Sequence, residues 1–281
     1  MKKTIVITGA AGVLCSAFAR ALAADGHNVA LLDLNEQATN ELAAKINAEG
    51  GGKALACPCS VLEKESLLQA KAKIDEAFGK CDVLINGAGG NSPRCTTAHE
   101  FYEGGDEAVT EFTTFFNIDR SGFDFVFGLN LVGTLLPSQI FLPDMLGRPG
   151  CSVLNISSMN AFTPLTKIPA YSAAKAAVSN FTKWLAVHFA KENIRVNAIA
   201  PGFFVTNQNR AMLFREDGTP TPRTEKILAA TPTGRFGKPE ELLGTLRFLV
   251  DEEASGFITG VVIPVDGGPV LDSVRKTGRL L

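Results

Sequence analysis

Three side chains that can hold or move a proton lie close together between Asn155 and Lys175. Ser158 stands thirteen residues before Tyr171, and Lys175 stands four residues after it. If Tyr171 lies at the start of a helix, positions i and i+4 share one face, so the phenol and the ammonium point the same way. The alanines after Tyr171, with apolar residues at helical spacing, favour that helix.

The chemical use of such a set is acid–base catalysis on an alcohol or a carbonyl group. A free tyrosine titrates near pH ~10, and a shift of ~3 units corresponds to about 4 kcal/mol. A fixed ammonium favours the phenolate, so we expect Lys175 to lower the pKa of Tyr171. Tyr171 could then exchange a proton with a carbinol oxygen, to which the Ser158 hydroxyl could also hydrogen-bond. Alone, a Tyr-x-x-x-Lys pair is more often part of a solvated helix face. Its interpretation as a catalytic pair therefore depends on the rest of the chain.

The first sixty residues predict a dinucleotide site. A buried strand, residues 4–8, leads through a small-residue turn into a helix that ends near residue 24. Backbone N–H groups and the helix dipole at such a turn favour an anion. The next strand, 29–32, ends at Asp33, twenty-one residues beyond Gly12. An acid at that place suits the ribose hydroxyls of NAD and repels a 2′-phosphate, so we expect NAD(H).

Strands alternate with helices along the rest of the chain. We expect further strands at about 54–57, 82–85, 153–156, 194–200 and 261–265, with helices at about 35–48, 63–78, 122–146 and 240–250. This alternation predicts an α/β fold: a single-domain, Rossmann-like, doubly wound parallel sheet of about seven strands over residues 1–281. Asp33, Asn86 and Ser158 all follow strands, so they should meet at the carboxyl edge of the sheet.

Two stretches have no regular period. Residues 90–121 mix polar residues with aromatic ones, and we expect them to form a packed insertion on the active-site side. Residues 203–224 have neither a helical nor a strand pattern, and we expect them to form a substrate lid.

Composition excludes several classes of partner. The formal net charge of −2 gives no electrostatic case for nucleic acid or an acidic membrane. There is no run of 18 apolar residues, so no membrane span is expected. Six cysteines and three histidines stand without metal-ligand or disulfide spacing, so we expect free thiols, no metal and a cytoplasmic protein.

The chain resembles the short-chain dehydrogenase/reductase family over essentially its whole length. The resemblance is carried by Thr8-Gly9 with its turn, residues 86–89 (Asn-Gly-Ala-Gly), Asn130, Ser158, Tyr171 with Lys175, residues 195–202, Thr259-Gly260 and residues 266–268. It implies hydride transfer between a nicotinamide and a carbonyl/alcohol pair. It also implies that Tyr171 is the general acid/base, that Ser158 holds the substrate oxygen, that Lys175 binds the nicotinamide ribose, and that Asn130 holds a water of the proton relay.

The same resemblance implies the cofactor-binding residues. They are Gly9, Gly12, Val13, Leu14, Asp33, Ser60, Val61, Asn86, Ala88, Gly89, Tyr171, Lys175, Pro201, Gly202 and Val205. The family turn usually has three glycines, at the positions of Gly9, Val13 and Cys15, and relatives usually have aspartate at Ser60. Val13 therefore adds bulk where the backbone should approach a pyrophosphate, and Ser60 should change an adenine contact.

Within the family, residues 89–97 and the Phe-rich segment that follows are similar to sugar-acid reductases that interconvert D-fructuronate and D-mannonate. That likeness implies a carboxylate-bearing sugar acid as substrate, with Asn91, Arg94, Ser158, Asn160 and Asn207 as candidate contacts. Lys167, Arg210 and Arg215 are further candidate cations by loop position. Family resemblance also implies a homotetramer or dimer.

Two alternatives remain. One is a gluconate or polyol dehydrogenase of the same family. The other is a protein that senses NAD without turnover, for which the altered glycine turn is the only support.

Overall fold

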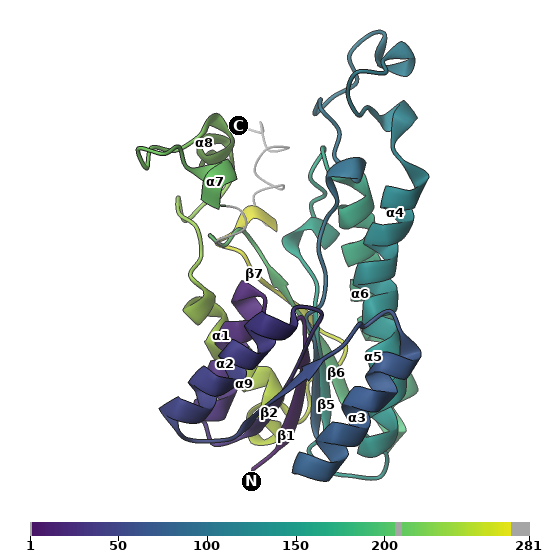
Figure 1. The fold of residues 1–281 in the computed structure, drawn as a ribbon. Coiled ribbons are helices and arrows are strands. Elements are labelled where there is room, and N and C mark those ends of the chain that lie inside the picture. The colour runs from purple at the N-terminus through teal and green to yellow at the C-terminus, as the bar shows by residue number, and fades with distance from the viewer. Residues whose placement is uncertain (1, 206–209, 271–281) are drawn as a thin grey trace.

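The computed structural model describes residues 2–205 and 210–270, and its centre is a parallel sheet (Figure 1). Seven strands pair in the order β3-β2-β1-β4-β5-β6-β7. The strands are β1 (Thr4–Thr8), β2 (Asn28–Asp33), β3 (Ala54–Pro58), β4 (Val83–Asn86), β5 (Ser152–Ile156), β6 (Arg195–Pro201) and β7 (Val262–Val265). The α/β doubly wound sheet expected from the sequence is therefore confirmed, with every predicted strand within a residue or two of its place.

Helices cover both faces of the sheet. In Figure 1, α1, α2 and α9 lie on one side, and α3, α5 and α6 lie on the other. The helices are α1 (Val13–Ala24), α2 (Glu36–Glu49), α3 (Lys64–Phe78), α4 (Arg120–Phe127), α5 (Gly133–Met145), α6 (Pro169–His188), α7 (Arg210–Leu213), α8 (Pro222–Ala229), α9 (Leu243–Val250) and α10 (Glu252–Ser255). The predicted helix at 240–250 begins as a 3-10 turn, Pro239–Leu242, before α9.

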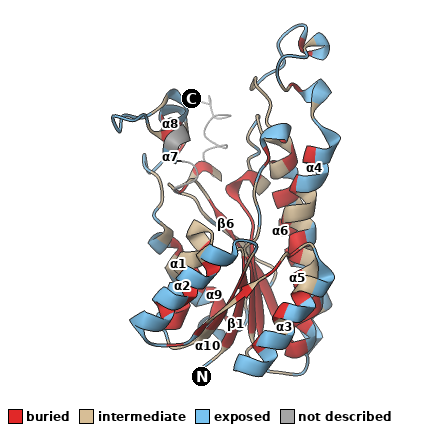
Figure 2. Ribbon diagram, in the orientation of Figure 1, coloured by how far each residue is buried: buried red, intermediate tan, exposed pale blue. Residues whose placement is uncertain are grey.

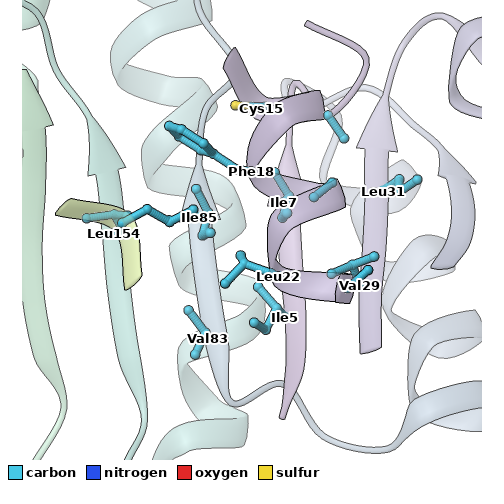
Figure 3. Close-up of a cluster of buried hydrophobic side chains, with 14 of the residues drawn as sticks. Ile5, Ile7, Cys15, Phe18, Leu22, Val29, Leu31, Val83, Ile85 and Leu154 are labelled. Carbon is cyan, nitrogen blue, oxygen red and sulfur yellow. The ribbon is translucent and has the colours of Figure 1, made fainter. Parts of the chain in front are cut away.

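The two layers of helices make two hydrophobic cores. Ile5 and Ile7 of β1 point to the side of α1, where they pack with Phe18 and Leu22 (Figure 3). Val6, between them, belongs to the opposite cluster with residues of α3 and α5. Successive side chains of a strand face opposite sides, and both sides are covered, so the central strands β1, β4, β5 and β6 are buried along their whole length, whereas β3 and β7 at the two edges are only partly buried or exposed (Figure 2).

The register brings the predicted site residues to one edge. Thr8 pairs with Asn86, and Asn86 pairs with Asn155, so the ends of β1, β4 and β5 lie side by side. Strand order reverses between β1 and β4, because β2 and β3 lie on one flank and β5 to β7 on the other. In doubly wound sheets the ligand cleft lies at the carboxyl ends beside such a reversal.

The long helix expected at 122–146 begins earlier and contains a defect. A π-helical turn, Gly128–Val132, separates α4 from α5 and carries Asn130. The continuous span Arg120–Met145 is 26 residues long and apolar enough to cross a membrane by length and composition. Half of its apolar window is buried within the fold.

The structure corrects one feature of each irregular stretch, the packing of the aromatic residues in 90–121 and the absence of helix in 203–224, while their roles as an active-site insertion and a substrate lid stay predictions. Residues 90–121 form short 3-10 turns on an arm that extends away from the sheet (Figure 1), and its aromatic residues Phe101, Tyr102, Phe115 and Phe116 are exposed. Phe116 makes edge-to-face contacts with Tyr102 and with Phe115 on the arm. Residues 203–224 are not free of helix, because they contain α7 and the start of α8.

Candidate active site

The first part of the site is a junction of two glycine turns. Gly9 has a φ of +64°, and a methyl group there would come within 2.8 Å of the Ala88 backbone. The Thr8 hydroxyl accepts the N–H groups of Gly87 (3.1 Å) and Ala88 (3.2 Å). Glycine is therefore required at position 9, both by its positive φ and by the close approach of the Ala88 backbone. The Thr8 hydroxyl connects the turn after β1 to the turn after β4 by hydrogen bonds.

The turn leads into a helix N-terminus. Gly12 precedes α1, and no described side chain caps its first turn. Val13 and Leu14 in that turn are half-buried, and Leu14 packs against the hydrophobic core on the side of α1. Asp33 lies opposite: Oδ2 accepts the Ala11 N–H at 3.0 Å and Oδ1 accepts the Asn35 N–H at 2.9 Å. Uncapped N–H groups with a carboxylate at the end of β2 fit a dinucleotide, whose phosphates and ribose need those partners.

Cys15 stands where the family turn usually has its third glycine. It is buried, and a methyl group on Gly87 would come within 2.1 Å of its Sγ. The absence of a side chain at Gly87 therefore leaves the room that the Cys15 side chain occupies. Burial raises the pKa of the Cys15 thiol to about 12, so it acts as a packing group and not as a nucleophile.

The proton-transfer residues meet on the other side of the cleft. Pro169 at the start of α6 places Tyr171 in its first turn, as predicted. The Tyr171 phenol hydrogen-bonds to Ser158, which follows β5 and whose hydroxyl accepts the Asn160 N–H at 3.2 Å. Lys175 is 4% exposed, and its Nζ donates to the Ile156 carbonyl at 2.8 Å. Ser158, Tyr171 and Lys175 therefore lie close together beyond the end of β5, while their shared catalytic role stays a prediction.

The electrostatics of this set differ from the sequence expectation. Burial raises the pKa of Tyr171, and its hydrogen bond to Ser158 offsets only part of that effect. The ammonium of Lys175 lies 5.7 Å from the centre of the tyrosine ring and bonds to a backbone carbonyl instead. Burial lowers its own pKa to about 8. The expected lowering of the Tyr171 pKa is thus wrong for this state, because desolvation acts on both groups.

The buried ammonium gives a testable pH dependence. Between pH 8 and the ordinary lysine pKa of 10.5, the unfolded chain holds a proton that folded Lys175 has released. The free energy of unfolding should therefore rise with pH through this window. We expect the difference between wild type and Lys175→Met, measured by urea unfolding without nucleotide, to rise by about 2 kcal/mol between pH 7.5 and 10. Lys183→Met, on the exposed side of α6, is the control; an equal slope in both variants would contradict burial of Lys175.

The Asn130 side chain connects the π-helical turn to the loop that follows β4. Its Nδ2 donates to the carbonyls of Gly90 and Val126, both at 2.7 Å, and its Oδ1 accepts the Gly90 N–H at 3.2 Å. A methyl group on Gly89 would touch both Asn130 Oδ1 (2.6 Å) and Lys175 Nζ (3.0 Å). Both polar atoms of the Asn130 side chain thus bind backbone groups, mainly of the loop after β4. A relay water at Asn130 stays a prediction.

Asn86 is buried and points into the protein. Its Nδ2 donates to Asn155 Oδ1 (2.8 Å) and Ser138 Oγ (3.1 Å), while Ser138 donates to the Thr134 carbonyl. Thr134 in turn donates to the Asn130 carbonyl at 2.8 Å. The Asn86 side chain is therefore linked through Ser138 and Thr134 to the helical turn that carries Asn130, and it is not free to contact a ligand.

The remaining predicted cofactor residues border the same edge. The Ser60 hydroxyl accepts the Leu62 N–H, and Val61 is buried against Gly133. Pro201 ends β6, and a methyl group on Gly202 would clash with Asp266. Val205 is partly exposed beyond them.

The predicted substrate residues are only partly brought together. Arg94 donates to Ser121 at 2.9 Å and lies 3.4 Å from Asp119, at the base of the arm. The Asn91 amide donates to Thr96. Asn160 lies directly beside Ser158, whereas Asn207 lies outside the described residues.

Sequence reasoning missed two anchoring groups. Thr8 was identified only as part of a motif. Its place at the end of β1, beside a glycine, is the sequence signal that could have indicated that its hydroxyl accepts two backbone N–H groups. The Ile156 carbonyl that holds Lys175 carries no side-chain signal, so only the fold could reveal it.

Comparison with known proteins agrees with this arrangement. The model of the family described as short chain dehydrogenase matches residues 3–216, about three quarters of the chain. The chain belongs to the short-chain dehydrogenase family. An oxidoreductase of Haemophilus influenzae without an established substrate is 59% identical over 266 residues, covering 95% of this chain and 92% of the relative.

Two solved short-chain dehydrogenase structures are informative. A candidate D-mannonate oxidoreductase from Haemophilus influenzae, crystallised with bound NAD, is 58% identical, covers 95% of both chains and has a TM-score of 0.91. The L-sorbose reductase of Gluconobacter frateurii, complexed with NADPH and L-sorbose, is 26% identical, covers 96% of this chain and 97% of its own, and has a TM-score of 0.83. Membership in this family makes the chain an oxidoreductase.

Proposed function

We propose that this short-chain dehydrogenase is an NAD(H)-dependent reductase of a keto sugar acid, of the D-fructuronate/D-mannonate type. The observation that carries the proposal is the phenol of Tyr171, hydrogen-bonded to Ser158 and backed by buried Lys175, at the edge where the glycine turn and Asp33 lie. When bound, the nicotinamide supplies the hydride, and the protein's own groups bind, orient and protonate the substrate.

Support for NAD(H) over its phosphorylated form comes from Asp33. A carboxylate at the end of β2 can accept ribose hydroxyls and repels a 2′-phosphate. Gly9, Gly12, Val13, Leu14 and the backbone of residues 86–89 would hold the rest of the dinucleotide. The similar structure with bound NAD is consistent with this choice.

The proton chemistry favours reduction at neutral pH. Because burial raises the pKa of Tyr171, the phenol keeps its proton and can donate it from Oη to a carbonyl oxygen. Ser158, already hydrogen-bonded to that phenol, would hold the same oxygen. Lys175 would contact the nicotinamide ribose and stabilise the tyrosinate that remains after the transfer.

Support for a carboxylate-bearing substrate comes from two lysines, Lys167 and Lys226, that contact the arm. Lys167 lies four residues before Tyr171, and its backbone carbonyl accepts the Thr97 N–H of the arm. Lys226 of α8 forms an ion pair with Glu100 of the arm and lowers the pKa of the Glu100 carboxyl. The positive charge of Lys167 lowers the same pKa by a smaller amount. We infer that the arm, 90–121, and the lid, 203–224, border the substrate, with Lys167 as the first candidate cation and Asn91, Arg94 and Asn207 as further ones.

The runner-up is a gluconate or polyol dehydrogenase, which the fold likeness to an L-sorbose reductase supports. The test is a panel of D-fructuronate, 5-ketogluconate and neutral ketoses with NADH and with NADPH, followed by absorbance of the reduced nicotinamide. We expect the highest kcat/KM for D-fructuronate with NADH. A higher kcat/KM for 5-ketogluconate or a neutral ketose would overturn the substrate assignment. Tight NADH binding with no turnover of any ketone would favour a sensor.

We also propose a homotetramer or dimer acting in the cytoplasm, with no nucleic-acid or membrane partner. Support for self-association comes from exposed apolar residues on α4 and α6, namely Phe123, Phe125, Trp184 and Val187. Light scattering of the purified protein would measure the assembly.

A further inference from the structure

We propose that Asn160 determines substrate specificity by hydrogen-bonding a hydroxyl on the carbon next to the reacting carbonyl, so that the site selects α-hydroxyketones. The inference rests on the proposed reductase function of the cleft, but it does not depend on the sugar acid itself.

The observation is an interior amide without a partner. Asn160 lies on the 3-10 turn Met159–Ala161 that follows Ser158, and it is 7% exposed. Over residues 2–205 and 210–270, no donor reaches its Oδ1, which is fully buried. Nearby, the amide of Asn130 binds Gly90 and Val126, and that of Asn155 binds Asn86 and Thr182. Asn86 Oδ1 also lacks a partner within the described ranges, but its Nδ2 is held by Asn155 and Ser138, whereas no hydrogen bond holds the Asn160 side chain there.

A buried amide without a hydrogen bond lowers stability, and such groups are rare unless a ligand or water completes them. Asn160 also lies next to the proposed oxygen-binding group, because its backbone N–H donates to the Ser158 hydroxyl at 3.2 Å. With the substrate oxygen held by Ser158, a side chain on the same turn reaches a neighbouring carbon of the substrate. An amide can donate to a hydroxyl or accept from one, so it suits a polyhydroxylated chain.

The backbone and side chain of Asn160 can be separated by mutation. Asn160→Leu keeps the N–H that orients Ser158 and has the same branching at Cγ, with somewhat larger terminal groups, but removes both polar atoms of the amide. If Asn160 only filled space, this variant would keep the selectivity of the enzyme. Removing a polar atom that has no partner should also leave the thermal midpoint near that of wild type.

The experiment compares hydroxyacetone with acetone, and also D-fructuronate, as substrates with NADH. We expect wild type to prefer hydroxyacetone, and Asn160→Leu to reduce that preference about tenfold, since one hydrogen bond to a substrate hydroxyl is lost. The loss should come from kcat/KM for hydroxyacetone, with acetone unchanged. Ser152→Ala is the matched control, because Ser152 Oγ is also buried without a partner in the described chain, but at the far end of β5.

Each outcome decides the inference. Wild type that reduced both ketones equally, or neither, would overturn it, and so would an unchanged preference in Asn160→Leu. A preference lost equally in Ser152→Ala would also overturn it. Failure to reduce D-fructuronate, with the Asn160-dependent preference for hydroxyacetone intact, would sink the proposed sugar-acid function and leave this inference standing.

Discussion

Tyr171→Phe should lower kcat by about a thousandfold while NADH binds as tightly as in wild type, since positioned acid–base groups contribute roughly 10²–10⁴-fold. Phenylalanine keeps the ring that packs with Ala170 and Ala174 beside Lys175. Only the hydroxyl that bonds to Ser158 is removed. Stopped-flow turnover and calorimetric NADH binding would measure the two effects separately.

The chain provides its own control for this variant. Tyr102 is the other of its two tyrosines, and it is exposed on the arm, where it donates to Glu107. Tyr102→Phe should leave kcat unchanged. If Tyr171→Phe retained turnover within a few-fold of wild type, Tyr171 would not be the proton donor. If both substitutions were equally damaging, the effect would not come from proton transfer.

Asp33→Ala should change the nucleotide preference by about 100-fold, because like charges placed together cost several kcal/mol and that repulsion would vanish for NADPH. Binding of NADH should weaken at the same time, since the ribose acceptor is lost and the Ala11 and Asn35 N–H groups lose their partner. The measurement is the dissociation constant of each nucleotide, together with kcat/KM.

Glu36→Gln is the matched control for Asp33. Glu36 stands three residues further on, is exposed and carries the same charge at the start of α2. It should leave the preference unchanged. If Glu36→Gln altered the preference as much as Asp33→Ala, the selectivity would reflect the overall field and not a contact at the end of β2.

Sequence alone predicted the sheet and the proton-transfer set because both leave local signals. Buried parallel strands appear as short apolar runs between helices, and α6 was identified from alanines and apolar spacing after Tyr171. The positions of Ser158 and Asp33 followed from strand ends, which parallel pairing brings to one edge.

What the sequence could not show depends on long-range contacts. The raised pKa of Tyr171 comes from burial by several elements, and the π-turn at Asn130 depends on a loop forty residues away. The exposed aromatics of the arm were misjudged because hydrophobic composition does not reveal which side of a loop meets solvent. The close approach of the Cys15 side chain to Gly87 joins two turns that are far apart in the sequence.

The most direct test of hydride transfer beside Tyr171 uses NADH carrying deuterium at the transferred position of the nicotinamide. The deuterated nucleotide and D-fructuronate are incubated with the enzyme, and the product is analysed by NMR. We predict one deuterium on the carbon that was the ketone, at full incorporation in wild type and at a rate reduced about a thousandfold in Tyr171→Phe. Product without deuterium at that carbon, or nucleotide bound and never oxidised by any ketone, would contradict the account.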